Sequence, residues 1–376
     1  MLGTGGLGPG KGLHMQRFWV RSKGFKYSVN VGCGAWRALA DFPQDRYSAI
    51  FILTERHLWE RWGEKLLREG GVKSAQPLFV PPGENSKSVK MVEEVGAELL
   101  KKGADRRSLL VAFGGGVVGD LGGFVASTYM RGIDCLQVPT TVLAQVDSSI
   151  GGKTAVNVRA MKNLLGTFYP PRMVLAEPMV LASLDERSFR SGFFEVAKHA
   201  ILSGPGLFKE LEAKASRFLP KQARDLEEIL ARAAKVKVEV VSRDEREAGL
   251  RRVLNLGHTF GHALEEASGY RRFLHGEAVG WGILIVSRLA ELLGVLEHGE
   301  GERIARLVRQ VSPLPTLHGL RVRRILELLP QDKKAVRGRI HWVIPERIGK
   351  VRISDQVPMN LVEAAFRDVQ RGGWHE

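Results

Sequence analysis

Short apolar runs separated by longer mixed stretches characterise the first half of the chain. The run Ala49–Leu53 is continuously apolar, which is typical of a parallel strand buried on both faces. Strands are predicted at Tyr27–Val31, Tyr47–Thr54, Leu78–Val80, Ser108–Phe113 and Leu136–Pro139, with helices at Leu58–Glu69 and Ser88–Lys102. Strands that alternate with helices predict an α/β domain.

The pattern turns helical from about Pro178. Ser183–Glu186 is a capping-box pattern, and the helix that it opens ends at the sequence Ser203, Gly204, Pro205. Further helices are predicted at Lys221–Arg246, from His258 to Gly269, at Glu277–Leu293, Arg303–Val311 and Arg324–Leu329, with a strand pair at Ile340–Ile344 and Gly349–Ile353. We therefore expect a disordered Gly-rich tail (1–15), an α/β domain (16–178) and a mainly helical domain (179–376).

The composition is that of a soluble protein large enough for two cores. Of 376 residues, 44% are hydrophobic and 26% charged, and no apolar run approaches the roughly 18 residues of a membrane span. The Gly-rich start lacks an apolar signal segment, and Met15 is a second candidate for the initiating residue. Cys33 and Cys135 cannot build a disulfide framework, which suits the reducing cytoplasm. We expect a cytoplasmic protein without a membrane partner.

The net charge is strongly positive, at +15 from 56 Lys and Arg against 41 Asp and Glu. Such a surplus occurs in nucleic-acid-binding proteins, but here the basic residues are scattered, without a basic tail or an aromatic-rich basic motif. An anionic small substrate explains the charge equally well. We predict no nucleic-acid partner; DNA retention that falls with salt and needs no cofactor would support the alternative.

A glycine motif follows the predicted strand Ser108–Phe113. Gly114, Gly116 and Gly119 have the dinucleotide-binding spacing and precede a helix, whose amino terminus offers free N–H groups to a pyrophosphate. Close packing of helix on sheet is the alternative explanation. Glu55 follows another strand, where an acid can accept hydrogen bonds from ribose hydroxyls, although a solvated surface glutamate would also fit.

The most polar loop of the chain is Gln145–Thr154, which Lys162 and Asn163 follow. Its lysine, acid and hydroxyls resemble a phosphate loop, but the Gly-x4-Gly-Lys-Ser/Thr spacing is missing, which excludes a nucleotide triphosphatase of that type. Lysines, an acid, hydroxyls and an amide in one Gly-containing segment favour recognition of a polyhydroxylated anion.

Three of the ten histidines lie within 18 residues and indicate a metal site. His258 and His262 are four residues apart and share a helix face, and His275 can return from the next helix. Such a pair also arises by chance, so a carboxylate must complete the site. Glu195 is the candidate, because apolar neighbours predict its burial with Lys198, although a solvated ion pair is the usual alternative.

The ordered motifs GGGVVGD, RG, VPTT, DSSIGGKT, KN, ExxK, LNxGHxxGHAxE and LHGEAV resemble those of the 3-dehydroquinate synthase family, from about Tyr27 to the end of the chain. The resemblance implies an N-terminal Rossmann-like NAD domain, a C-terminal mainly helical metal domain, an active site in the cleft between them, and a homodimer. It also implies zinc, or cobalt, bound by Glu195, His258 and His275. His262 becomes a substrate-contacting residue, so the ligand pair 258/262 suggested by spacing is replaced by 258/275.

The resemblance assigns two further sets of residues. The substrate-contacting, catalytic set is Asp147, Lys153, Asn163, Lys198, Lys237, Arg251, Asn255, His262 and Lys334, with Arg131 contributed by a neighbouring subunit. The cofactor-binding set is Glu55, Gly83, Glu84, Asn85, Ser86, Lys87, Gly115, Gly116, Val117, Val118, Gly119, Asp120, Thr140, Thr141, Lys153, Lys162 and Ser183.

The implied substrate is 3-deoxy-D-arabino-heptulosonate 7-phosphate, whose phosphate and carboxylate account for the basic residues. NAD accepts a hydride from C5 and later returns it, phosphate is eliminated, and an intramolecular aldol step closes the ring of 3-dehydroquinate. Rivals are other sugar phosphate cyclases, making 2-deoxy-scyllo-inosose or epi-valiolone from substrates without a carboxylate. A metal-dependent alcohol or glycerol dehydrogenase is a more remote rival. Retention of Lys237, Arg251, His262 and Lys334 favours the carboxylated substrate.

Overall fold

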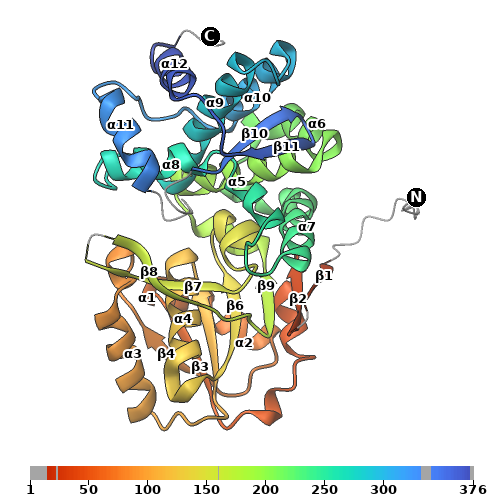
Figure 1. Ribbon diagram of the computed structural model, residues 1–376. Helices are drawn as coiled ribbons and strands as arrows, with labels where there is room; N and C mark the ends of the chain where they lie inside the picture. The colour runs from red at the N-terminus through yellow and green to blue at the C-terminus, as the bar shows by residue number, and fades with distance from the viewer. Residues whose placement is uncertain (1–14, 23, 160, 332–339, 373–376) are drawn as a thin grey trace.

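A seven-stranded sheet forms one half of the protein and a set of helices forms the other (Figure 1). This computed structural model describes residues 15–22, 24–159, 161–331 and 340–372. The strands are β1 (Gln16–Arg21), β2 (Lys26–Val31), β3 (Ile50–Thr54), β4 (Gln76–Phe79), β5 (Leu109–Gly114), β6 (Asp134–Pro139) and β9 (Met173–Ala176). Their order is β1-β2-β9-β6-β5-β3-β4, and only the β1–β2 pair of this sheet is antiparallel.

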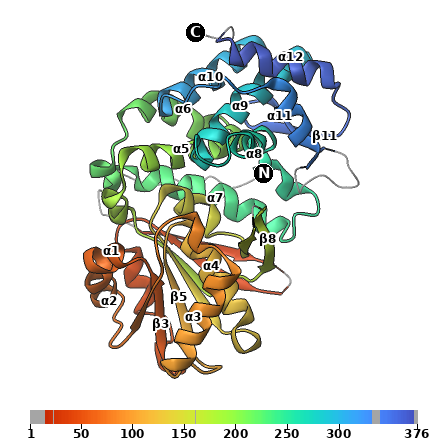
Figure 2. The same cartoon turned by 90° about the vertical axis from the view of Figure 1, so that its left-hand side faces the viewer.

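Alternate residues of the central strands pack on opposite faces of the sheet. Phe51 and Leu53 of β3 join the core under α3 (Val89–Lys101) and α4 (Gly116–Thr128). Ile52 joins the core on the other face, with a 3-10 helix at Ala35–Leu39 and α2 (Glu64–Glu69). In Figure 2 the two helix layers lie on either side of the sheet. Burial of both faces explains why the strands are continuous apolar runs, and the predicted α/β class is confirmed.

The helical half is built around one apolar helix. The helices are α5 (Glu186–Ser203), α6 (Pro205–Lys214), α7 (Glu227–Arg243), α8 (His258–Ala267), α9 (His275–Leu292), α10 (His298–Val311), α11 (Val322–Leu328) and α12 (Met359–Gln370), with a hairpin of β10 (Trp342–Arg347) and β11 (Lys350–Ser354). Nearly every residue of α9 from Gly276 to Ala290 is buried. Its core is continuous with that of β2 and β9, because Val29 and Val174 belong to the same cluster.

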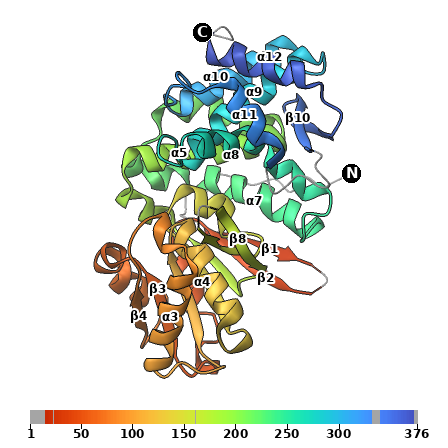
Figure 3. The same ribbon diagram turned by 60° about the vertical axis from the view of Figure 1, so that its left-hand side comes forward.

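A second hairpin lies at the junction of the two halves (Figure 3). It consists of β7 (Lys153–Val158) and β8 (Met161–Phe168), paired antiparallel. β7 packs tightly on α4, since a Cβ added at Gly123 would lie 2.4 Å from the Thr154 methyl group. The hairpin therefore extends the polar loop across the carboxyl edge of the sheet towards the helical half.

Several element boundaries differ from the predictions. The predicted loop 145–154 contains a helical turn at Ala144–Ser148 and the first residues of β7. Asp185, not Ser183, caps α5, because its carboxylate accepts the Ser188 N–H at 2.9 Å. α7 starts at Glu227 rather than Lys221, after a 3-10 segment. Elements without a prediction are β1, β7, β8, β9, α6 and α12.

Two predictions fall outside the described residues: the disordered tail, apart from Met15, and Lys334. Among the helices that the structure describes, none is long and apolar enough to cross a membrane.

Candidate active site

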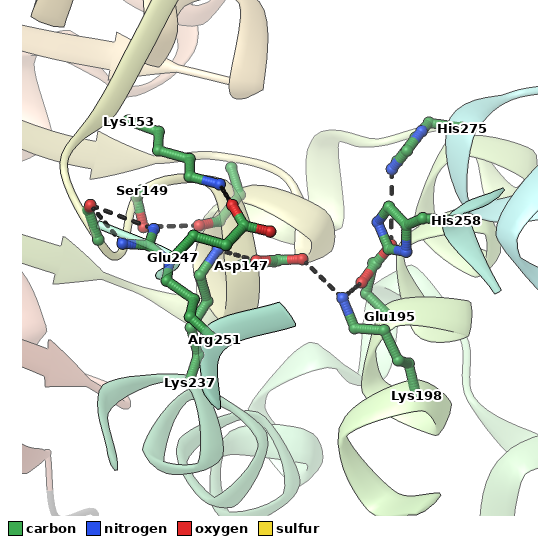
Figure 4. A network of polar contacts seen from close by, with 12 residues as sticks. Asp147, Ser149, Lys153, Glu195, Lys198, Lys237, Glu247, Arg251, His258 and His275 are labelled. Atoms are coloured by element: carbon green, nitrogen blue, oxygen red, sulfur yellow. Dashed lines mark hydrogen bonds and ion pairs between the residues drawn. The ribbon is translucent and has the colours of Figure 1, made fainter. Parts of the chain in front are cut away.

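Three donor groups from three helices converge where the halves meet (Figure 4). His258 begins α8, His275 begins α9, and Glu195 lies in the middle of α5. The Nε2 atoms of both histidines lie 3.6 Å from Oε1 of Glu195, and one donor atom from each residue fits within 4.8 Å of the others. Two imidazole nitrogens and a carboxylate oxygen are the donor set of a divalent metal site that leaves positions for substrate.

Hydrogen bonds on the far side of each ring orient these donors. The His258 Nδ1 atom lies 3.2 Å from the Leu256 carbonyl oxygen, and the His275 Nδ1 atom lies 3.1 Å from a Glu265 carboxylate oxygen. When Nδ1–H donates to an oxygen, Nε2 keeps its lone pair for a metal. Both Nε2 atoms face Glu195, so the tautomers that these contacts favour suit metal binding.

Glu195 has the surroundings of a metal-binding carboxylate. Its side chain is fully buried, and among the described residues neither oxygen accepts an oriented hydrogen bond. The Lys198 ammonium, one turn further along α5, forms an ion pair with it. A buried carboxylate is costly unless cations compensate it, and the His258 and His275 nitrogens that face Glu195 suit a metal cation in addition to Lys198. The predicted burial of Glu195 and Lys198 is confirmed.

His262 lies beside the triangle, next to both of its histidines. Its ring centroid is 5.6 Å from that of His258 and 6.1 Å from that of His275. His262, Glu265 and His275 form a second possible donor group. The group with Glu195 is favoured because both of its histidines direct Nε2 at one buried carboxylate.

A chain of charged groups connects this triangle to the polar loop. Asp147, in the turn before β7, contacts the Lys237 ammonium of α7 and lies 3.1 Å from Lys198 Nζ. Lys153, at the start of β7, pairs with Glu247, which also accepts a hydrogen bond of 2.6 Å from Asn255. Five of the predicted substrate residues are thus brought together from both halves: Asp147, Lys153, Lys198, Lys237 and Asn255. Burial lowers the Lys153 pKa despite the opposing charge of Glu247.

Glu247 was not assigned to the site from the sequence, although it contacts two residues that were. It lies in the connection between α7 and α8 with φ of 61°, an uncommon conformation for a residue other than glycine. No local pattern distinguishes such a residue, because Lys153 lies 94 positions away in the chain. Arg251 is buried in the same region and donates to the Gly151 carbonyl at 3.2 Å, so here it holds the polar loop.

The predicted cofactor residues lie mainly along the carboxyl edge of the parallel strands, where nucleotides bind in folds of this kind. Glu55 follows β3, Gly115 caps α4 after β5, and Thr140 follows β6. The α4 amino terminus has no side-chain cap, which leaves N–H groups for an anion. Burial raises the pKa of Glu55 and also that of Asp120, although Lys87 Nζ lies 2.5 Å from Asp120 and opposes the shift.

Three predicted residues have other surroundings. A Cβ on Gly119 would lie 2.8 Å from the Gln137 amide oxygen, so Gly119 packs closely on the side chain of a β6 residue. The Ser183 hydroxyl donates to the Val180 carbonyl at 2.6 Å. Arg131 lies in an exposed turn with φ of 74°, just before β6 begins. This is the amino-terminal end of the parallel strands, whereas the site lies at their carboxyl ends. Arg131 therefore cannot reach the site of its own chain.

Comparison with known proteins identifies the fold and the family. The family models described as 3-dehydroquinate synthase N-terminal and C-terminal match residues 77–191 and 192–335. The 3-dehydroquinate synthase of Solibacter usitatus (strain Ellin6076) is 40% identical over 341 residues, covering 91% of this chain and 96% of that protein. The chain belongs to the 3-dehydroquinate synthase family.

A second curated relative has the same name, and a solved structure of a related cyclase has the same fold. The 3-dehydroquinate synthase of Dictyoglomus turgidum (strain DSM 6724 / Z-1310) is 42% identical over 343 residues, 91% of this chain and 95% of that one. The solved structure of ValA, the 2-epi-5-epi-valiolone synthase of Streptomyces hygroscopicus subsp. jinggangensis 5008 with NAD+ and Zn2+ bound, matches with a TM-score of 0.80 and 31% identity, covering 89% of this chain and 95% of that one. The predicted function, a phosphate-eliminating cyclase of the 3-dehydroquinate synthase type, is confirmed by the two curated relatives of that name.

Proposed function

We propose that this chain converts 3-deoxy-D-arabino-heptulosonate 7-phosphate to 3-dehydroquinate and phosphate, using a divalent metal and NAD. The observation that carries this proposal is the triangle of Glu195, His258 and His275 beside a cluster of lysines. When bound, the metal supplies Lewis acidity to substrate hydroxyls, and NAD supplies a hydride acceptor that is regenerated within the cycle. Zinc and cobalt both suit this donor set.

The basic residues bind and orient the two anionic groups of the substrate. Phosphate is proposed to bind Asn163, Lys198, Asn255 and Lys334. Arg251, with Lys153 or Lys237, would hold the carboxylate, since a guanidinium offers a bidentate fork. Carboxylates at Asp147 and Glu247 hold Lys237 and Lys153 in place before substrate arrives, which supports a preformed anion-binding site. His262, beside the metal ligands, is placed to move hydroxyl protons.

NAD is proposed to lie along the carboxyl edge of the sheet. Its pyrophosphate would bind at the α4 amino terminus around Gly115, Gly116 and Val117, with Glu55 at a ribose. Further contacts would come from the loop Gly83–Lys87 and from Thr140, Thr141 and Lys162. Gly83 supports the loop assignment, because its φ of 93° suits glycine and nothing lies within 4 Å of its added Cβ.

We also propose a cytoplasmic homodimer in which Arg131 of one copy completes the phosphate site of the other. The position of Arg131 at the far edge of its own sheet supports a role towards a second copy. Mixing R131A with a variant inactivated at Glu195 tests this. Recovery of activity in the mixed dimers is expected, and two inactive variants that never complement each other would contradict it.

The activity test measures phosphate release and 3-dehydroquinate formation with catalytic NAD and zinc, with and without chelator. Release that needs both cofactors, without accumulation of NADH, is the expected result. Sedoheptulose 7-phosphate is the matched control substrate, because it lacks the carboxylate. Turnover of the control substrate alone would reject the proposal in favour of a valiolone-type cyclase, and would remove the carboxylate role of Arg251.

A further inference from the structure

Glu265 connects a metal ligand to the opposite half of the protein. It lies on α8, and its side chain is 4% exposed. One carboxylate oxygen lies 3.1 Å from His275 Nδ1, and the other accepts a hydrogen bond of 3.1 Å from Lys162 Nζ. We propose that Glu265 is a positioning residue that orients His275 for metal binding and makes this orientation depend on the β7–β8 hairpin. The inference rests on the proposed metal site and extends it.

The two histidine ligands differ in how much support they receive. His258 contacts a backbone carbonyl two residues away, that of Leu256, so the local chain fixes its ring. The His275 side chain is 35% exposed, and its Nδ1 contact comes from another helix. A carboxylate on the far nitrogen of a metal-binding histidine fixes the tautomer and strengthens the donor. His275 therefore depends on Glu265 for an orientation that His258 obtains locally.

Lys162 carries the link across the junction. It belongs to β8, in the sheet half, and its ammonium lies 4.4 Å from the ring centroid of Tyr270, beyond the end of α8, as well as against Glu265. Its neighbour Asn163 and the first residue of the same hairpin, Lys153, are proposed substrate contacts. A ligand that orders the hairpin would thus also stabilise the Lys162–Glu265 contact, and metal and substrate binding should favour each other.

Glutamine at position 265 cannot satisfy both partners. A carboxylate offers two acceptor oxygens, one each for the Lys162 ammonium and the His275 Nδ1–H. An amide has one acceptor, so its NH2 group must face either the ammonium or Nδ1. In the second arrangement the amide donates to Nδ1, which moves the ring proton to Nε2, the atom that the metal needs.

The test measures zinc affinity by competition with a chromogenic chelator in E265Q, in K162M and in the double variant. E265Q should bind zinc about 10-fold or more weakly, in the range for loss of such supporting partners. K162M should lose less, and the double variant should lose less than the product of the two, because Lys162 acts through Glu265. Zinc affinity equal to the parent's in E265Q and K162M would overturn the inference. K162M keeps the test valid should E265Q fold poorly, since Lys162 is partly exposed.

The matched control is E291Q. It removes a largely buried carboxylate of α9, the helix of His275, whose partner is Arg288 at a distance of 3.0 Å. Its zinc affinity should equal that of the parent; an equal loss in E291Q would mean that general destabilisation of α9, and not orientation of His275, weakens binding. Turnover of the heptulosonate phosphate by the parent separates the two proposals. An inactive parent whose zinc affinity still depends on Glu265 refutes the proposed function alone, whereas an active parent with unchanged affinity in both variants refutes this inference alone.

Discussion

The Lys198 ammonium lies 3.1 Å from an Asp147 carboxylate oxygen while also pairing with Glu195. A single buried lysine of α5 therefore joins the metal triangle to the polar loop of the sheet half. The Lys198 side chain is 1% exposed, so few water molecules can solvate its ammonium group.

Replacing this lysine should destabilise the protein strongly. K198M leaves Glu195 buried without its cation, and breaking a buried pair in this way costs about 3 kcal/mol or more. Urea unfolding of the zinc-free protein measures the loss. K235M removes a lysine that pairs with Glu239 on the α7 surface, and should change the free energy of unfolding by less than about 0.5 kcal/mol. Equal effects of the two variants would contradict the buried role of Lys198.

Metal should stabilise the folded chain through Glu195. Zinc at about 100 times its dissociation constant adds roughly 2.7 kcal/mol to the free energy of unfolding, because it binds the folded state. E195Q should abolish this gain and the activity, and chelation of the parent should remove both until zinc or cobalt is restored. Thermal unfolding with and without zinc measures the effect. E239Q changes an exposed glutamate and should retain the full gain; a zinc shift that survives in E195Q would exclude Glu195 as a ligand.

Two glycines in neighbouring helices should respond in opposite ways to alanine. A Cβ at Gly119 in α4 would lie 2.8 Å from the Gln137 amide oxygen, and moving this amide also breaks its 3.0 Å hydrogen bond to the Gly119 carbonyl, so G119A should cost about 1 kcal/mol. Gly96 in α3 has nothing within 4 Å of its added Cβ, so G96A should stabilise the protein by about 0.5 to 1 kcal/mol. Denaturant unfolding compares them, and a neutral G119A would show that α4 is not tightly packed there.

The sequence predicted features that depend on local pattern. Continuous apolar runs identified the central strands, since burial on both faces leaves no polar alternation. Apolar neighbours on α5 predicted the burial of Glu195. The β8 strand was missed because it exposes Met161, Leu164 and Leu165, so neither continuous burial nor alternation marks it. Exposure explains the missed β8, whereas the four-residue strand β9 was missed although Val174 and Ala176 are fully buried.

Relationships between distant residues could not be predicted from pattern alone. Helical spacing favoured His258 with His262, because residues four apart share a face. The structure instead directs His258 and His275 at Glu195, which follows from the packing of α8, α9 and α5. Glu247 was missed for the same reason, since its contact with Lys153 joins opposite halves of the protein. The family resemblance supplied the 258/275 pair that spacing did not.

The stability of the protein should depend on His199 at mildly acidic pH. His199 is fully buried on α5, and among the described residues neither ring nitrogen has a hydrogen-bond partner. Burial, together with the nearby charge of Lys198, lowers the pKa of His199 well below its ordinary value of 6.5. The unfolded chain therefore takes up a proton near pH 6.5 that the folded chain does not, and the stability present above this pH is lost as the pH falls.

Denaturant unfolding of the zinc-free chain at pH 7, 6 and 5 tests whether the free energy of unfolding falls as the pH falls. Below pH 6.5, His199 should contribute up to about 1.4 kcal/mol per pH unit to the slope of the free energy of unfolding against pH, because one proton is taken up on unfolding. H199F should lack that contribution whatever its absolute stability, while H298Q should keep the parent's slope, because His298 is 70% exposed. The other histidines are common to parent and H199F, so the difference in slope isolates His199. A slope in H199F as steep as the parent's would mean that His199 is protonated in the folded protein, and that Lys198 and burial do not hold it neutral.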